Sequence, residues 1–61
     1  MDLFIICRKD GRAEISKEYK NKTKEEAREI IKHYLSGYEG YICTCKTKEE
    51  AIKTIEGLNG N

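Results

Sequence analysis

The sequence has 61 residues, of which 38% are hydrophobic and 38% are charged, and it contains neither proline nor tryptophan. A chain of this length can pack two short helices against a small sheet, and it has little room for an enclosed active-site cavity. The formal net charge of +1 excludes a disordered acidic tail and a strongly basic nucleic-acid-binding arm. We therefore expect one domain over residues 1–61 that is not an enzyme.

The longest apolar run extends from Leu3 to Cys7. A run this short cannot form the apolar core of a signal peptide or span a bilayer, so we expect a cytoplasmic protein with no membrane segment. The chain has three cysteines, Cys7, Cys43 and Cys45. An odd number is unusual in a secreted disulfide framework, and we expect reduced thiols.

A β-hairpin is predicted at the N-terminal end. Residues 3–8 are rich in β-branched and aromatic side chains, which is typical of a strand. The dipeptide Asp10-Gly11 suits the positive φ angles of a tight turn. A second strand follows from Ala13 to Tyr19, where apolar residues alternate with polar ones until Lys17 interrupts the pattern.

Two helices are predicted to begin with the same hexapeptide, Lys-Thr-Lys-Glu-Glu-Ala, at residues 22–27 and 46–51. In each copy the threonine hydroxyl can accept from the amide of the second glutamate, whose carboxylate can accept from the threonine amide, forming a capping box. Gly37 is expected to end the first helix, and Gly57 or Gly60 the second. Because the segments before the two copies differ, we interpret them as independent helix starts rather than a duplicated unit.

A third strand over residues 40–46 completes the order ββαβα, so the fold class is α+β. Sequential strands usually lie side by side, and crossover connections are right-handed. The most apolar strand, residues 3–8, should be central. We therefore predict a three-stranded, mainly antiparallel sheet of order 2-1-3 with both helices on one face.

That arrangement would leave apolar side chains of the central strand on the face without helices. A two-residue Asp-Gly turn would leave Leu3, Ile5 and Cys7 there, whereas a bulged three-residue turn would leave Phe4 and Ile6. Such a face on so small a domain usually binds a partner, unless long charged side chains cover it.

We therefore expect a small non-enzymatic protein-interaction module that binds a protein partner, and also itself as a homodimer. Binding would use the open sheet face or the edge of the third strand. Small domains of this kind often act as regulators or inhibitors, including ones encoded by phages or mobile elements. The candidate partner-binding residues are Leu3, Phe4, Ile5, Ile6 and Tyr41.

Positive charge gathers in the hairpin and in the link to the first helix. Residues 1–24 contain seven Lys or Arg against four acids. Nucleic-acid binding is therefore the alternative function. The candidate contacts are Arg8, Lys9, Arg12 and Lys17.

The charged hairpin followed by a Thr-Lys-Glu-Glu-Ala helix resembles, over residues 3–35, the arm-type DNA-binding domains of phage integrases and the related AP2 domains. The resemblance implies that the sheet enters a DNA groove. Those domains place three strands before the helix, and this sequence has two.

The remaining candidate chemistry is a Cys43-Thr44-Cys45 segment and a single histidine, His33. Two cysteines separated by one residue lack the spacing of a zinc knuckle, and we place His33 on the polar side of its helix. There is no nucleophile motif, no pair of carboxylates and no glycine-rich phosphate loop. The sequence predicts no catalytic residues, no metal, no cofactor and no small-molecule substrate.

Overall fold

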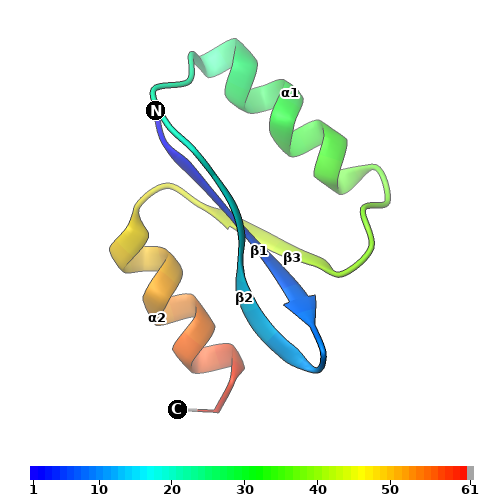
Figure 1. Cartoon of the computed structure of the whole chain (residues 1–61). Coiled ribbons are helices and arrows are strands. Elements are labelled where there is room, and N and C mark those ends of the chain that lie inside the picture. The colour runs from blue at the N-terminus through cyan, green and yellow to red at the C-terminus, as the bar shows by residue number, and fades with distance from the viewer. Residues whose placement is uncertain (61) are drawn as a thin grey trace.

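The computed structural model describes residues 1–60 and has the predicted order of elements (Figure 1). The elements are β1 (Leu3–Lys9), β2 (Arg12–Tyr19), α1 (Lys24–Leu35), β3 (Tyr41–Cys45) and α2 (Lys48–Leu58). The strands lie in the order β2-β1-β3, and β1 is antiparallel to both neighbours. The predicted α+β fold and sheet order are confirmed. Neither helix in the described part of the chain has the length and apolar character needed to cross a membrane.

The hairpin turn is the two-residue alternative. Asp10 and Gly11 have φ angles of 52° and 81°, the left-handed values that this turn requires. The turn pairs Lys9 with Arg12. The turn therefore sets the register of the first half of the hairpin.

A β-bulge at Ser16 changes the register of the second half. Ile6 pairs with Ile15, whereas Ile5 pairs with Lys17, so Ser16 has no partner on β1. The extra residue moves Tyr19 to the opposite sheet face from Ile15. The interruption of the alternating pattern at Lys17 is thus the sequence signal of this bulge.

The helices lie on opposite faces of the sheet, so the prediction that both cover one face is wrong (Figure 1). On one face Phe4 and Ile6 belong to the same cluster as Ala51 of α2. On the other face Ile5 packs with Tyr34 of α1. The physical reason lies in β1, which is apolar on both sides, so that covering each side with a helix removes more apolar surface from water.

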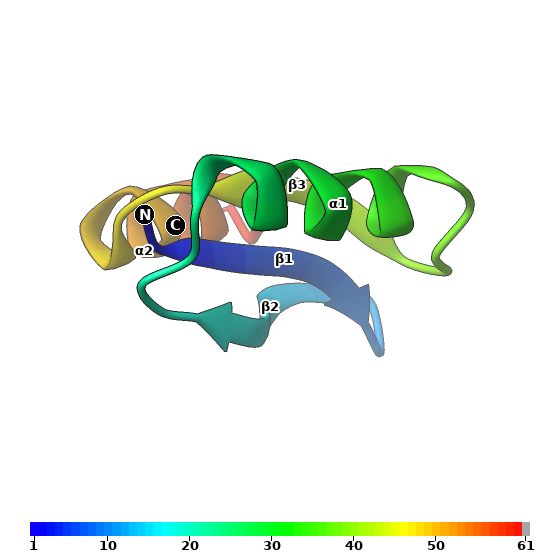
Figure 2. The ribbon, with the colours of Figure 1, turned by 90° about the horizontal axis from the view of Figure 1, so that it is seen from above.

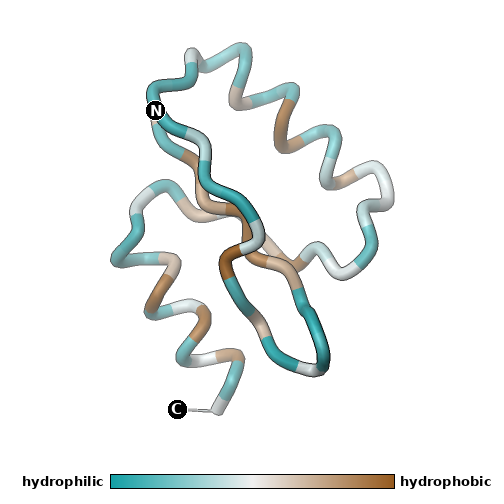
Figure 3. The backbone as a smooth tube through the Cα atoms, viewed as in Figure 1, coloured by the Kyte–Doolittle hydropathy of each residue, from teal (hydrophilic) through white to brown (hydrophobic). Residues whose placement is uncertain are grey.

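The two helices cover their faces unequally. α2 packs against all three strands, whereas α1 packs mainly against β3. Figure 2 shows α1 over β3, with β2 uncovered on that face. In Figure 3 hydrophobic residues lie in the middle of the sheet and on both helices, and the hairpin tip is hydrophilic. The position of α1 therefore leaves both of its flanks accessible.

The start and end of α1 follow the prediction. The Glu26 amide donates to Thr23 Oγ1 at 3.1 Å, and the Thr23 amide donates to Glu26 Oε1 at 2.9 Å. This hydrogen bond from the Thr23 backbone holds the pKa of Glu26 below its ordinary value. After the helix, Gly37 takes a φ of 116° and the Tyr38 amide donates to the Tyr34 carbonyl.

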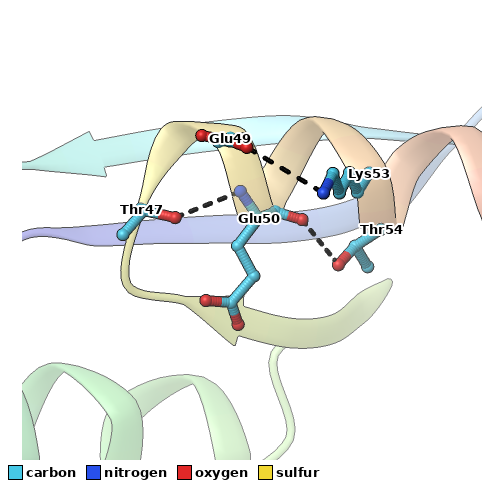
Figure 4. Close-up of polar contacts among 5 residues, drawn as sticks. All are labelled: Thr47, Glu49, Glu50, Lys53 and Thr54. Atoms are coloured by element: carbon cyan, nitrogen blue, oxygen red, sulfur yellow. Dashed lines mark hydrogen bonds and ion pairs between the residues drawn. The ribbon is translucent and has the colours of Figure 1, made fainter.

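The start of α2 differs from that of α1 although the hexapeptide is the same. Thr47 Oγ1 accepts from the Glu50 amide at 3.1 Å, but among residues 1–60 the Glu50 carboxylate returns no bond to Thr47. Figure 4 shows the Glu50 side chain extending toward β3 instead. The second predicted capping box is therefore only half formed. Gly60, with a φ of 79°, follows the end of α2, and Gly57 lies within the helix.

Candidate functional site

The expected open apolar face does not exist in the described part of the chain. Leu3, Ile5 and Ile6 are 0% exposed and Phe4 is 2% exposed. These four predicted partner-binding residues therefore form the core, because α1 and α2 cover the two faces. Tyr41 is half-buried in β3, with its hydroxyl 2.8 Å from that of Thr44.

The outer edge of β2 is protected against a further strand. Asn59, directly after α2, accepts from the Ala13 amide at 2.8 Å and donates to the Ala13 carbonyl at 3.0 Å, as a neighbouring strand would. The bulge at Ser16 interrupts the same edge, and four of the eight residues of β2 are charged. Bulges and charges of this kind prevent unwanted strand pairing.

The outer edge of β3 has no such charges, because its sequence is Tyr-Ile-Cys-Thr-Cys. The Arg8 amide donates to the Gly40 carbonyl at 2.7 Å. Because the direction of the backbone groups alternates along a strand, Arg8 and every second residue before it in β1 direct their N–H and C=O toward β3. Cys43 and Cys45 pair with two of these residues. The backbone N–H and C=O of Thr44, between them, therefore point away from the sheet.

The free edge is short. A register shift leaves Ile42 without a partner on β1, so β3 also contains a bulge. The uninterrupted part runs from Cys43 to Cys45. An added strand would meet three regular residues and then the bulge, so neighbouring side chains must supply part of any binding energy.

One flank of α1 carries Ile31 and Leu35, which lie on the same side of the helix because they are four residues apart. Ile31 is half-buried and Leu35 is 67% exposed. Ile31 also lines a cavity of about 260 Å³ together with Lys46, which directly follows β3. We call the free edge of residues 43–45, together with Ile31 and Leu35, the β3-edge surface.

The charges of α1 are distributed unequally over its two flanks. The flank facing β3 carries Lys24 and Arg28. The flank facing β2 borders an open groove of about 650 Å³, whose apolar lining is Tyr19 and Ile30. Three carboxylates, Glu25, Glu26 and Glu29, line that groove, and so do two cations, Lys22 and Arg28, the second of which borders both flanks. Among the described residues, the cavity on the first flank has cations and no carboxylate in its lining, whereas the groove on the second has one carboxylate more than cations, so an acidic ligand is favoured at the first flank.

Tyrosines fill the space between α1 and the sheet. The Tyr34 ring lies 4.6 Å from that of Tyr38 and 5.7 Å from that of Tyr41, measured between centroids. Its hydroxyl is 3.3 Å from the Tyr19 hydroxyl. The hydrogen bond with Tyr19 and the burial of the phenol raise the pKa of Tyr34 above its ordinary value. These contacts join α1 to β2 and β3, and the packing of Tyr34 against Ile5 joins it to β1.

The cysteines and the histidine do not form a common site. Cys43 and Cys45 belong to the cluster under α2. The pKa of the Cys43 thiol is raised above its ordinary value, mainly by burial and to a smaller extent by the neighbouring Cys45. His33 is exposed on α1, and its ring meets that of Tyr34 edge-on at 5.3 Å. Within residues 1–60 no group of three or more His, Cys, Asp or Glu side chains is placed to hold a metal ion.

Three of the four predicted nucleic-acid contacts lie together. Arg8, Lys9 and Arg12 are exposed at the hairpin tip. Lys17 lies beyond the bulge, and its Nζ is 5.5 Å from the centroid of the Tyr19 ring. The structure therefore groups three cations and separates the fourth.

Comparisons of the chain with protein-family models, with curated proteins and with solved structures found no match. The function must therefore be inferred from the fold and its surfaces.

Proposed function

We propose that this chain is a protein-interaction module that acts by binding rather than by catalysis. Its β3-edge surface would take an extended segment of a partner protein as a fourth strand. The observation that carries the proposal is the contrast between the two sheet edges. Asn59, a bulge and four charged residues protect β2, whereas β3 has no charge and packs against α1, which carries an exposed Leu35.

Strand addition suits this surface energetically. The partner backbone would satisfy the outward N–H and C=O of Thr44, and its side chains would cover the apolar flank of α1. Fully burying a leucine side chain contributes about 1.5–3 kcal/mol. A partner that covers Leu35 would therefore gain affinity from packing as well as from backbone hydrogen bonds.

The space beside β3 favours a single segment over a second copy of the chain. Adjacent strands lie about 4.8 Å apart, whereas packed helices need about 8–10 Å between their axes. Because α1 lies over β3, pairing β3 with the β3 of a second copy would bring two α1 helices too close (Figure 2). An extended segment brings no helix with it, so we propose a partner of different sequence.

Selection from a display library of random 12-residue peptides tests this proposal, with binding mapped by amide chemical shifts. Bound peptides should shift the amides of residues 43–46 and leave those of β2 unchanged. Leu35→Glu should weaken binding about tenfold, which corresponds to about 1.4 kcal/mol. Ile52→Glu is the matched control, because Ile52 is an exposed apolar residue of α2. Peptides that map to β2, or a library without binders, would refute strand addition at β3.

The cations at the hairpin tip support nucleic-acid binding as the second candidate function. Arg8, Lys9 and Arg12 are exposed, and of their side chains only Arg8 makes a hydrogen bond among residues 1–60, to the Gly11 carbonyl. Binding through phosphates should weaken steeply as salt rises, and again on Arg12→Ala. A titration of duplex DNA and of RNA at low salt checks this, and no binding to either would exclude it.

A further inference from the structure

We infer that the segment bound at the β3-edge surface carries an acidic side chain, which is received between Lys24, Arg28 and Lys46. This inference rests on the proposed function and names the chemistry of the partner. The three cations line the cavity of about 260 Å³ at the end of β3. Ala27 and Ile31 give this cavity an apolar wall, so a Glu or Asp side chain would find both packing and charge.

These three cations have no acidic partner within the described chain. All three are exposed, and no carboxylate of residues 1–60 lies within 4.0 Å of their charged groups. The ion pair that does form joins Lys53 to Glu49 on α2. The cavity therefore presents positive charge that an incoming carboxylate can neutralise.

The spacing of α1 predicts where the acidic residue lies in the segment. Ala27, Ile31 and Leu35 are four residues apart, so they rise by about 6 Å per step along the helix. Alternate residues of a strand face the same side and rise by about 6.8 Å. One side of an extended segment can therefore place three successive side chains opposite these three levels of α1.

The direction follows from the arrangement of the sheet. Both strand pairs of the sheet are antiparallel, and we infer the same for the added segment. α1 begins near Lys46, at the end of β3, so a segment antiparallel to β3 runs in the direction of α1. Read from its N-terminus, the preferred motif is acidic-x-apolar-x-apolar.

The display selection, repeated with a charge-reversed surface, tests this inference. The wild-type chain should enrich Asp or Glu two positions before the first apolar residue. Lys46→Glu should abolish that preference or replace it with Lys or Arg. Lys9→Glu is the matched control, because it makes the same charge change at the exposed hairpin tip and should leave the motif unchanged.

A selected peptide measures how much the acidic side chain contributes to affinity. Its ends are acetylated and amidated, so that its only carboxylate is that of the side chain. Replacing its Glu with Gln should weaken binding about tenfold at low salt. The difference should shrink as salt rises, because the Debye length falls from about 10 Å at 0.1 M to about 3 Å at 1 M. Equal affinity of the two peptides would overturn the inference.

The outcomes distinguish a failure of this inference from a failure of the proposed strand addition at β3. Peptides that map to residues 43–46 without an acidic preference refute the inference and leave strand addition intact. Peptides that map elsewhere refute both. Sedimentation that shows dimers, with the β3 amides perturbed by self-association, would identify a second copy as the partner and refute the acidic segment.

Discussion

Asn59→Ala should destabilise the protein by exposing the outer edge of β2. The Asn59 side chain makes two hydrogen bonds to the backbone of Ala13, which lies 46 positions away in the sequence. It thereby fixes the end of α2 against the strand. Alanine can make neither bond, so the Ala13 amide and carbonyl would have to bond to water.

The expected magnitude follows from the two bonds. A typical intramolecular hydrogen bond contributes about 1 kcal/mol net, so the variant should lose about 2 kcal/mol. A domain of this size has a total unfolding free energy of roughly 3–9 kcal/mol. At about 4–8 °C per kcal/mol, the midpoint of thermal unfolding should fall by about 8–16 °C.

Thermal unfolding and amide hydrogen exchange measure this effect together. Exchange at the Ala13 amide should become faster in Asn59→Ala. Asn59→Asp should lose at least as much stability at neutral pH, because an oxygen would replace the donor that faces the Ala13 carbonyl. Glu56→Ala, at an exposed position of α2, is the control and should stay within about 0.5 kcal/mol. Unchanged exchange at Ala13 with an unchanged midpoint would show that Asn59 does not protect this edge.

Two further predictions concern the turn before β3 and the tyrosines beneath α1. A Cβ on Gly40 would lie 2.8 Å from the Arg8 carbonyl oxygen at a φ of +81°, so Gly40→Ala should cost about 2–3 kcal/mol in urea unfolding. Gly37→Ala also has a positive φ but meets no atom within 4 Å, and equal losses in the two variants would contradict the close approach. Tyr34→Phe should cost about 1 kcal/mol through the lost hydrogen bond with Tyr19. Because the pKa of Tyr34 is raised above 10.0, the unfolded chain loses this proton first and stability falls as pH rises above 10. That alkaline loss should be smaller in Tyr34→Phe, and identical pH profiles would exclude Tyr34 as its source.

The local elements of the fold could be predicted from the sequence because their determinants are close together in the chain. The Asp10-Gly11 turn depends on two residues that accept positive φ angles, and it was predicted correctly. The capping box of α1 involves residues three apart. The apolar character of β1 on both sides also placed it correctly at the centre of the sheet.

The candidate site was predicted less well, because it depends on which face each helix covers. Leu3, Phe4, Ile5 and Ile6 were expected at an open surface, and they are buried because α1 and α2 take opposite faces. Neither helix sequence indicates which side of β1 the helix will cover. That choice depends on packing between residues far apart in the chain.

The repeated hexapeptide shows the same division between local and tertiary information. The sequence by itself determined that a helix begins at each copy, since the threonine hydroxyl caps both. Only the tertiary structure decided what the second glutamate does: Glu26 completes its capping box, whereas Glu50 extends toward β3 (Figure 4). The sequence likewise supplied Asn59 and the uncharged β3, but only the folded chain places Asn59 on β2 and leaves β3 as the free edge. Backbone caps act within one helical turn, whereas a protected edge requires segments that meet only after folding.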